Sequence, residues 1–156
     1  MNAKPAVLFV CLGNICRSPL AEAALKAEAA RIGLDIDVDS AGIGSWHVGE
    51  PPDPRARRTA KRHGLDVSGQ RARKIAKADF ARFDHIIALD HEVLDALERM
   101  RPADSVAQVN LLLDYVEGRE GEEVADPYMG GEADFEAAWG DVSEAARQLA
   151  NCLAKR

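Results

Sequence analysis

The chain has 156 residues, of which 47% are hydrophobic and 29% are charged, and its formal net charge is -6. This length suits one hydrophobic core, so we expect a single domain over residues 1–156. The negative net charge argues against an extended nucleic-acid interface, but it is compatible with a small basic pocket. No apolar run approaches the ~18 residues that a membrane span needs, so we expect no membrane partner.

The cysteines and the start of the chain bear on the cellular compartment. Cys11, Cys16 and Cys152 are an odd number, which argues against a disulfide framework and for reduced thiols in the cytoplasm. The apolar run near the start resembles a signal peptide only faintly, because Gly13 and Arg17 interrupt it early. No C-x-x-C pair or histidine cluster offers zinc ligands, so we expect no metal and no cofactor. Nothing in the sequence specifies an oligomeric state, and a monomer is the default expectation.

The first elements alternate between strand and helix. Residues 6–10, AVLFV, are a continuous apolar run typical of a strand that is buried on both faces. A helix is predicted from about Ser18, with Pro19 in its first turn and Gly33 just past its end. Residues 35–42, DIDVDSAG, alternate between polar and apolar side chains, which predicts a second strand.

The middle of the chain begins with a loop. Residues 43–54 are rich in glycine and proline, which predicts a long surface loop. Residues 54–64 predict a short basic helix, whose charges we interpret as a solvated face rather than a docking site. Residues 85–90, HIIALD, predict a third strand, and residues 91–100 predict the helix that follows it.

The last third contains one more strand and the closing helix. Residues 106–113 contain the fourth predicted strand, and residues 114–133 form a polar, glycine-rich loop. Residues 134–155 predict an amphipathic helix, with Cys152 on its core-facing stripe. The alternation of strands and helices predicts an α/β fold with a four-stranded, doubly wound parallel sheet and helices on both faces. In such folds ligands bind beyond the carboxyl ends of the strands.

The loop CLGNICRS, residues 11–18, lies at such a strand end and has the chemistry of an oxyanion site. The first turn of the following helix presents unpaired N–H groups and the positive end of its dipole. Gly13 and Asn14 are the loop residues that best tolerate left-handed backbone angles, which turn successive N–H groups inward. Arg17 adds a planar fork that matches two phosphate oxygens. A Walker-type nucleotide loop is excluded, because Gly-Lys-Ser/Thr is missing.

Cys11 lies at the base of this predicted cradle. Inward N–H dipoles and a nearby arginine favour a thiolate, which would be a nucleophile aimed at the bound phosphorus. Ser18 is close enough to donate to the same sulfur or to help it leave. A lone cysteine would be read as a packing residue. The spacing Cys-x5-Arg-Ser between a strand and a helix favours catalysis instead.

Six motifs now identify a family resemblance. FVCLGNICRSPLAE closely resembles the signature of the low-molecular-weight protein tyrosine phosphatases, and DSAG (39–42), W-x-V-G-x-x-P-D-P-R-A (46–56), HG (63–64), ARKI (72–75) and ADPY (125–128) follow in the family's order. The resemblance spans nearly the whole chain and implies phosphocysteine chemistry without a metal. It assigns Cys11 as nucleophile, Arg17 as phosphate clamp and Asp126 as general acid. The implied phosphate-binding residues are Leu12, Gly13, Asn14, Ile15, Cys16, Arg17 and Ser18, and the implied hydrogen-bond network that shapes the loop is Asn14, Ser18 and Ser40.

The need for an acid supports Asp126 separately. Cleavage of a phosphate monoester releases an alkoxide or phenoxide, which requires a proton. Asp126 is followed by a rigid proline and then by Gly130 and Gly131, which permit motion. Without the cysteine loop, the same Asp-Pro pair would be read as a turn.

The expected substrate is a phosphotyrosine-containing protein. Ile15 stands where the resembling arginine phosphatases carry threonine, which favours phosphotyrosine over phosphoarginine. Residues 17–151 contain no cysteine, so the relay of thioredoxin-linked arsenate reductases cannot operate. The expected slot for a flat ring consists of Leu12, Trp46, Tyr128 and Met129, with Met129 standing where the family often has a second aromatic residue.

Two further possibilities remain open. Cys11, once oxidised to a sulfenic acid, could condense with Cys16 into a protective disulfide, as the resemblance also suggests; the alternative is that Cys16 packs behind the loop. A protein of another class, a non-catalytic phosphate-binding or redox-sensing module, could use the same cradle. The presence of Asp126 argues against that class, because a binding module needs no positioned acid.

Overall fold

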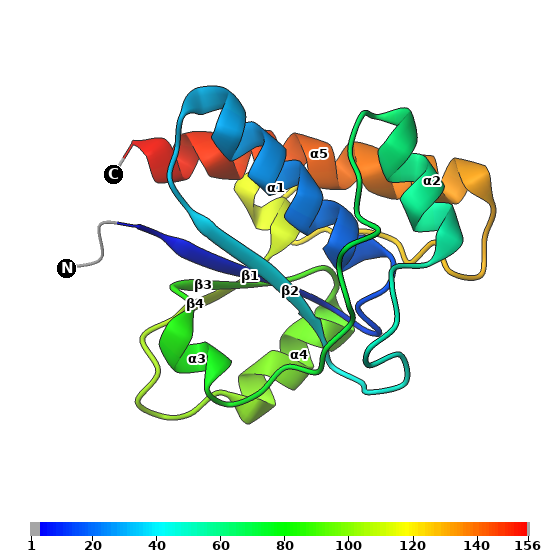
Figure 1. Cartoon of the computed structure of the whole chain (residues 1–156). Helices are drawn as coiled ribbons and strands as arrows, with labels where there is room; N and C mark the ends of the chain where they lie inside the picture. Colours follow the sequence, from blue (N-terminus) through cyan, green and yellow to red (C-terminus); the bar gives the residue numbers. More distant parts are fainter. Residues whose placement is uncertain (1–3, 156) are drawn as a thin grey trace.

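Four parallel strands form one sheet in the order β2-β1-β3-β4 in the computed structural model, which describes residues 4–155 (Figure 1). The central strand β1 pairs with β2 on one side and with β3 on the other. All residues of β1 are buried, as its apolar run predicted. The strand bounds are Ala6–Cys11 for β1, Asp37–Gly42 for β2, His85–Ala88 for β3 and Gln108–Leu111 for β4.

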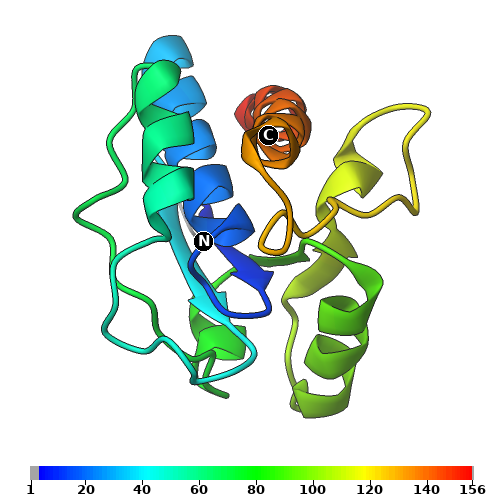
Figure 2. The same cartoon turned by 90° about the vertical axis from the view of Figure 1, so that its right-hand side faces the viewer.

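Helices cover both faces of the sheet, which confirms the predicted α/β class (Figures 1 and 2). The helices α1, α2 and α5 lie on one face, and α3 and α4 lie on the other. A short 3-10 helix, η1, follows β4 directly. The bounds are Arg17–Ile32 for α1, Pro54–Arg62 for α2, Asp79–Arg82 for α3, His91–Met100 for α4, Leu112–Tyr115 for η1 and Glu132–Ala154 for α5.

The two faces of β1 explain its composition. Val7 and Phe9 point into the core beneath α1 and α5, whereas Leu8 and Val10 point into the core beneath α3 and α4. Successive side chains of a strand alternate between faces, so a strand covered on both sides must be apolar at every position. Complete burial of one such side chain is worth roughly 1.5–3 kcal/mol.

The ends of the elements follow local signals. Gly33 ends α1 in a left-handed conformation with φ of 70°, and its N–H reaches back to the last turn. Asp90 caps α4 by accepting from the N–H of Val93 at 2.8 Å. The second strand starts later and the third ends earlier than predicted, β4 lies within the predicted range 106–113, and the four-residue helix α3 was not predicted.

The prediction that Cys152 faces the core is wrong, because its side chain is exposed. The buried stripe of α5 passes through Leu149 and Leu153, which are one helical turn apart. Residue 152 is displaced from residue 153 by about 100° around the helix axis and therefore faces solvent.

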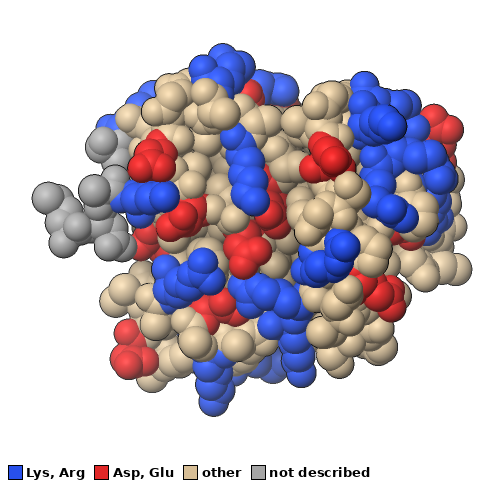
Figure 3. Space-filling model, viewed as in Figure 1, with Lys and Arg blue, Asp and Glu red and all other residues tan. Residues whose placement is uncertain are grey.

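Charged side chains are unevenly distributed. Lys and Arg gather over α2, whereas the rest of the same face mixes both signs (Figure 3). Arg58 and Lys61 are exposed, and Arg62 forms ion pairs with Glu132 and Glu136 of α5. Within residues 4–155, no helix is long and apolar enough to cross a bilayer.

The sheet holds the loop between β1 and α1 against the end of β2. Gly42, the last residue of β2, leaves no space for a side chain: an added Cβ would lie 3.1 Å from both the Gly13 carbonyl carbon and the Leu12 carbonyl oxygen. Both neighbours are backbone atoms, so neither can rotate away. The loop 12–16 therefore packs directly on the β2 backbone.

We expect Gly42→Ala to lower the free energy of unfolding by about 1–3 kcal/mol, because the new methyl group overpacks two backbone segments. The matched control is Gly140→Ala, an exposed position within α5 where an added Cβ meets nothing within 4 Å. That change should stabilise the protein by about 0.5–1 kcal/mol, since Ala favours a helix over Gly. Urea unfolding of both variants checks the prediction, and equal effects at the two positions would contradict it.

Candidate active site

A cavity of about 170 Å³ opens at the carboxyl edge of the sheet, beyond the end of β1. The loop between β1 and α1 forms its floor, and the loops around residues 46 and 126 form its walls. Its lining residues are Cys11, Leu12, Gly13, Ile15, Cys16, Arg17, Trp46, His47, Asp126 and Tyr128. The predicted nucleophile, clamp and acid therefore share one cavity.

Asn14 shapes the floor from behind the cavity. It is the one non-glycine residue of the described range with positive φ, at 59°. Its side-chain amide donates to Ser18 Oγ at 2.8 Å and to Ser40 Oγ at 3.0 Å. Its side-chain oxygen accepts from the Arg73 N–H at 3.0 Å. Asparagine tolerates this left-handed region, and three hydrogen bonds over-determine it here. Gly13 was also expected to take positive φ, but it does not.

Cys11 is the last residue of β1 and is buried, with 3% of its surface exposed. The Asn14 N–H donates to its Sγ at 3.3 Å, and Ser18 Oγ lies 2.9 Å from the same atom. Hydrogen-bonding groups of the loop and of α1 therefore face this sulfur. The sulfur also lies beside the N-terminus of α1, whose dipole favours negative charge.

Arg17 begins α1 and is only 2% exposed. Its Nη1 donates to Asp90 Oδ2 at 2.7 Å and to the Val124 carbonyl at 2.9 Å. Its Nη2 lies 3.6 Å from Asp126 Oδ2. Burial opposes the charge of this guanidinium, but Cys11, Asp90 and Asp126 outweigh burial and raise the pKa of Arg17 above its ordinary value. The cation is thus fixed in orientation at the cavity floor.

Asp126 lies across the cavity in the loop before α5, and its side chain is 43% exposed. Its Oδ1 accepts from the Tyr128 N–H at 3.1 Å, which orients the carboxyl group. Arg55 holds this loop from α2: it donates to the Gly130 carbonyl at 3.1 Å and lies 5.4 Å from the centre of the Tyr128 ring. Asp53, in turn, pairs with Arg55 at 3.0 Å.

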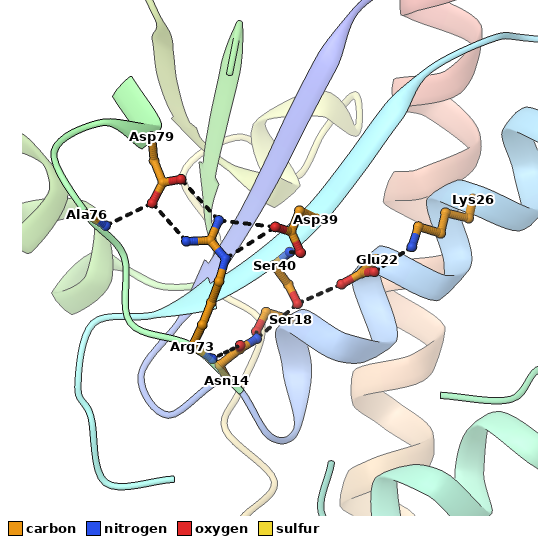
Figure 4. Close-up of polar contacts among 9 residues, drawn as sticks. All are labelled: Asn14, Ser18, Glu22, Lys26, Asp39, Ser40, Arg73, Ala76 and Asp79. Carbon is orange, nitrogen blue, oxygen red and sulfur yellow. Dashed lines mark hydrogen bonds and ion pairs between the residues drawn. The ribbon is translucent and has the colours of Figure 1, made fainter. Parts of the chain in front are cut away.

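A chain of polar contacts continues behind the loop (Figure 4). Ser40 Oγ, which accepts from Asn14, donates to Glu22 Oε1 at 2.8 Å. Lys26 donates to the other oxygen of Glu22 at 2.6 Å. The Glu22 carboxylate is buried, and this partner one helical turn away compensates its charge.

The second thiol of the loop differs from the first. Cys16 is buried, and burial, assisted by the nearby carboxylate of Asp53, raises the pKa of its thiol. Cys16 therefore stays protonated at neutral pH. Both cysteines of the loop line the same cavity.

The structure brings most predicted residues together. Asn14, Ser18 and Ser40 lie behind the cavity and form the expected network. Leu12, Trp46 and Tyr128 line the cavity, but Met129 is not among the lining residues and is 92% exposed.

The side-chain amide of Gln70 donates to the Pro19 carbonyl in the first turn of α1, at 3.1 Å. Sequence reasoning missed Asp90 and His47, although each had a positional signal. Asp90 ends the run HIIALD at the carboxyl edge of the sheet, and His47 follows Trp46. No group of three or more His, Cys, Asp or Glu side chains in residues 4–155 could hold a metal ion.

Comparisons with known proteins agree with this geometry. The model of the family described as low molecular weight phosphotyrosine protein phosphatase matches residues 6–156. YfkJ of Bacillus subtilis, a low molecular weight protein-tyrosine-phosphatase, is 41% identical over 152 residues, which are 96% of each chain. The low molecular weight phosphotyrosine protein phosphatase of Schizosaccharomyces pombe is 44% identical over 138 residues, which are 86% of this chain and 88% of the relative.

Solved structures extend the likeness to the fold. The crystal structure of YfkJ matches with a TM-score of 0.91 at 40% identity, over 99% of this chain and 97% of that chain. The crystal structure of DARP, a Drosophila arginine phosphatase, matches with a TM-score of 0.89 at 38% identity, over 94% of this chain and 96% of that chain. A family model that covers nearly the whole chain, together with full-length relatives at about 40% identity, shows that this chain belongs to the low molecular weight phosphotyrosine protein phosphatase family.

Proposed function

We propose that this protein hydrolyses phosphotyrosine in protein substrates through a phosphocysteine intermediate on Cys11. The observation that carries the proposal is the convergence of Cys11, Arg17 and Asp126 on one cavity beside a helix N-terminus. The names of the full-length relatives support the same activity. Catalysis by positioned charge and hydrogen bonds needs no metal here.

The first step transfers the phosphoryl group to the enzyme. The Cys11 thiolate attacks phosphorus in line with the leaving oxygen, an S–P bond forms and the P–O bond to the phenol breaks. Asp126 gives its proton to the departing phenolate oxygen. Arg17 and the backbone N–H groups of the loop stabilise the equatorial oxygens throughout.

The second step releases phosphate. The Asp126 carboxylate takes a proton from water as the water oxygen attacks phosphorus, and the S–P bond breaks. The electron pair returns to Cys11 as a thiolate, which Ser18 Oγ and the Asn14 N–H stabilise from 2.9 and 3.3 Å. Asp126 regains the protonated state that the next cycle requires.

The choice of phosphotyrosine rests on the shape of the cavity. Ile15 is 8% exposed and lines the cavity beside Cys11, where its branched apolar side chain suits a flat aromatic ring. Trp46 and Tyr128 supply further aromatic surface at the mouth. Overall identity alone does not separate the substrate classes, since the Drosophila arginine phosphatase is 38% identical. Reduced thiols persist most readily in the cytoplasm, which supports it as the place of action.

Cys16 is proposed to protect the nucleophile. Peroxide oxidises the Cys11 thiolate to a sulfenic acid. Cys16 Sγ then attacks that sulfur as its thiol proton passes to the departing hydroxide, so that the S–O bond breaks, water leaves and a disulfide forms. A dithiol reductant restores both thiols. Both cysteines line the same cavity, which supports this role.

We expect Cys11→Ser to lower the turnover of p-nitrophenyl phosphate by at least about a thousandfold, because the serine hydroxyl is a poor nucleophile without a base. Asp126→Ala should lower it by about 10²–10⁴-fold. The loss in Asp126→Ala should be larger for phenyl phosphate, whose leaving group needs the proton more. Steady-state kinetics check these expectations. A wild-type protein without turnover would show the catalytic proposal to be wrong and would favour a phosphate-binding module.

The substrate class is tested at Ile15. Wild type should hydrolyse phosphotyrosine peptides with a higher kcat/KM than matched phosphoarginine peptides. Ile15→Thr should lower the ratio of kcat/KM for phosphotyrosine to kcat/KM for phosphoarginine by about tenfold or more. The reason is that a hydroxyl replaces apolar surface where a polar guanidinium would lie. Ile15→Val is the matched control that keeps the site apolar. A wild-type preference for phosphoarginine would make the protein an arginine phosphatase.

The redox role is tested by a cycle of peroxide and dithiothreitol. Wild type should lose activity in peroxide and regain most of it on reduction, whereas Cys16→Ser should lose activity irreversibly, because Cys11 proceeds to the sulfinic acid. Cys152→Ser, at an exposed position remote from the cavity, is the control and should behave as wild type. Equal recovery in Cys16→Ser and wild type would exclude the disulfide.

A further inference from the structure

One hydrogen bond to Asn14 comes from a distant segment. The backbone N–H of Arg73 donates to Asn14 Oδ1 at 3.0 Å, across 59 positions of sequence. The two other bonds of the Asn14 side chain use its amide nitrogen, so the Arg73 N–H fixes which way the amide faces. The left-handed conformation of Asn14 therefore depends on where residue 73 lies.

The segment around residue 73 has little regular structure of its own. It contributes one isolated bridge to the sheet, between Lys74 and Gly42. The Gly42 N–H donates to the Arg73 carbonyl at 2.8 Å, and the Ile75 N–H donates to the Gly42 carbonyl at 2.9 Å. Two further bonds lead to the loop at residues 49–50: the Gly49 N–H donates to the Ala72 carbonyl and the Ala72 N–H donates to the Glu50 carbonyl, both at 2.9 Å. So short a ladder fixes the segment only weakly against the sheet, so contacts of the Arg73 side chain with regular elements add to its positioning.

The Arg73 side chain supplies those contacts (Figure 4). Nη1 and Nη2 donate to the two oxygens of Asp79, at 3.0 and 3.1 Å, in a bidentate pair. Nε donates to Asp39 Oδ2 at 3.2 Å. Asp79 is buried and also accepts from the Ala76 N–H at 2.8 Å. The guanidinium thus ties its own backbone both to β2, through Asp39, and to the start of α3, through Asp79.

We propose that Arg73 is a positioning residue of the phosphate loop: its guanidinium, clamped between Asp39 and Asp79, holds its backbone N–H against Asn14 and keeps the loop preformed for a phosphate. This inference rests on the proposed function of the loop. Arg73 is absent from the lining of the cavity and acts only through Asn14. Bidentate geometry requires arginine, because a lysine ammonium cannot serve both carboxylates in this way.

A purely structural role would give a different result from this positioning role. If the clamp only stabilised the fold, its loss would lower the melting temperature and leave kcat/KM unchanged well below that temperature. If it positions Asn14, its loss must lower kcat/KM and weaken the binding of inorganic phosphate while most molecules remain folded. In a variant that lacks the Asn14 side chain, the Arg73 substitution must cause no further loss of kcat/KM, because Arg73 acts on the loop only through Asn14.

The experiment compares Arg73→Gln, Arg73→Lys and Asp79→Asn with the control Lys74→Ala, an exposed neighbour on the same segment. We expect kcat/KM for p-nitrophenyl phosphate to fall by about tenfold in Arg73→Gln and by less in Arg73→Lys, with Lys74→Ala unchanged. In an Asn14→Ala background, Arg73→Gln should cause a further loss of less than about twofold. Arg73→Lys and Asp79→Asn provide the test if Arg73→Gln fails to fold.

Calorimetry with inorganic phosphate separates this inference from the proposed function. Weaker phosphate binding by Arg73→Gln supports the positioning role even if the wild-type protein shows no turnover, an outcome that would overturn only the catalytic proposal. The inference is overturned if folded Arg73 variants keep wild-type kcat/KM and phosphate affinity. Losses that multiply independently in the Asn14→Ala background would overturn it as well.

Discussion

The side-chain amide of Asn14 makes three hydrogen bonds while its backbone takes a φ of 59°. This conformation turns the Asn14 N–H towards Cys11 Sγ and starts the curve of the loop that ends at Arg17. A single residue in a sparsely populated backbone region persists only when its surroundings over-determine it. Contacts from β2, α1 and the segment at residue 73 meet that condition, so three separate parts of the chain set the shape of one short loop.

The balance of charge around Arg17 is the second constraint. A buried guanidinium is costly unless it is paired, and here Asp90, Asp126 and the sulfur of Cys11 all lie near it. Asp90 is well suited to this task because it also caps α4, which fixes the carboxylate independently of any ligand. The cation is thus oriented before any ligand arrives, and preorganisation of this kind is the main source of electrostatic catalysis in enzymes.

Much of the fold could be predicted because its signals are local. The apolar run of β1, Gly33 at the end of α1 and the apolar stripe of α5 each follow from neighbouring residues. The short helix α3, the start of β2 and the end of β3 could not be predicted, because tertiary packing rather than periodicity defines them. Cys152 shows the same limit, since one position along a helix separates the core from solvent.

The residues of the site also fall into those that the sequence could predict and those that only the folded chain brings together. Cys11, Arg17 and Ser18 lie in one contiguous motif, so their proximity could be predicted from sequence. Asp39, Asp79 and Arg73 come from separate segments, and only the folded chain shows that they form a clamp behind Asn14. The sheet topology did offer a signal for Asp90, because it follows a strand at the edge where ligands bind.

We propose that Cys11, held by the loop that Asn14 shapes, carries the phosphoryl group between the two steps. Mass spectrometry of acid-quenched Asp126→Ala during turnover of p-nitrophenyl phosphate tests it most directly, because loss of the acid/base group slows hydrolysis of the intermediate. We expect a protein heavier by one phosphoryl group, with the modification mapped to the peptide that contains Cys11 and absent from Cys11→Ser/Asp126→Ala. An unmodified protein that still turns over, or a phosphoryl group on another residue, would contradict it.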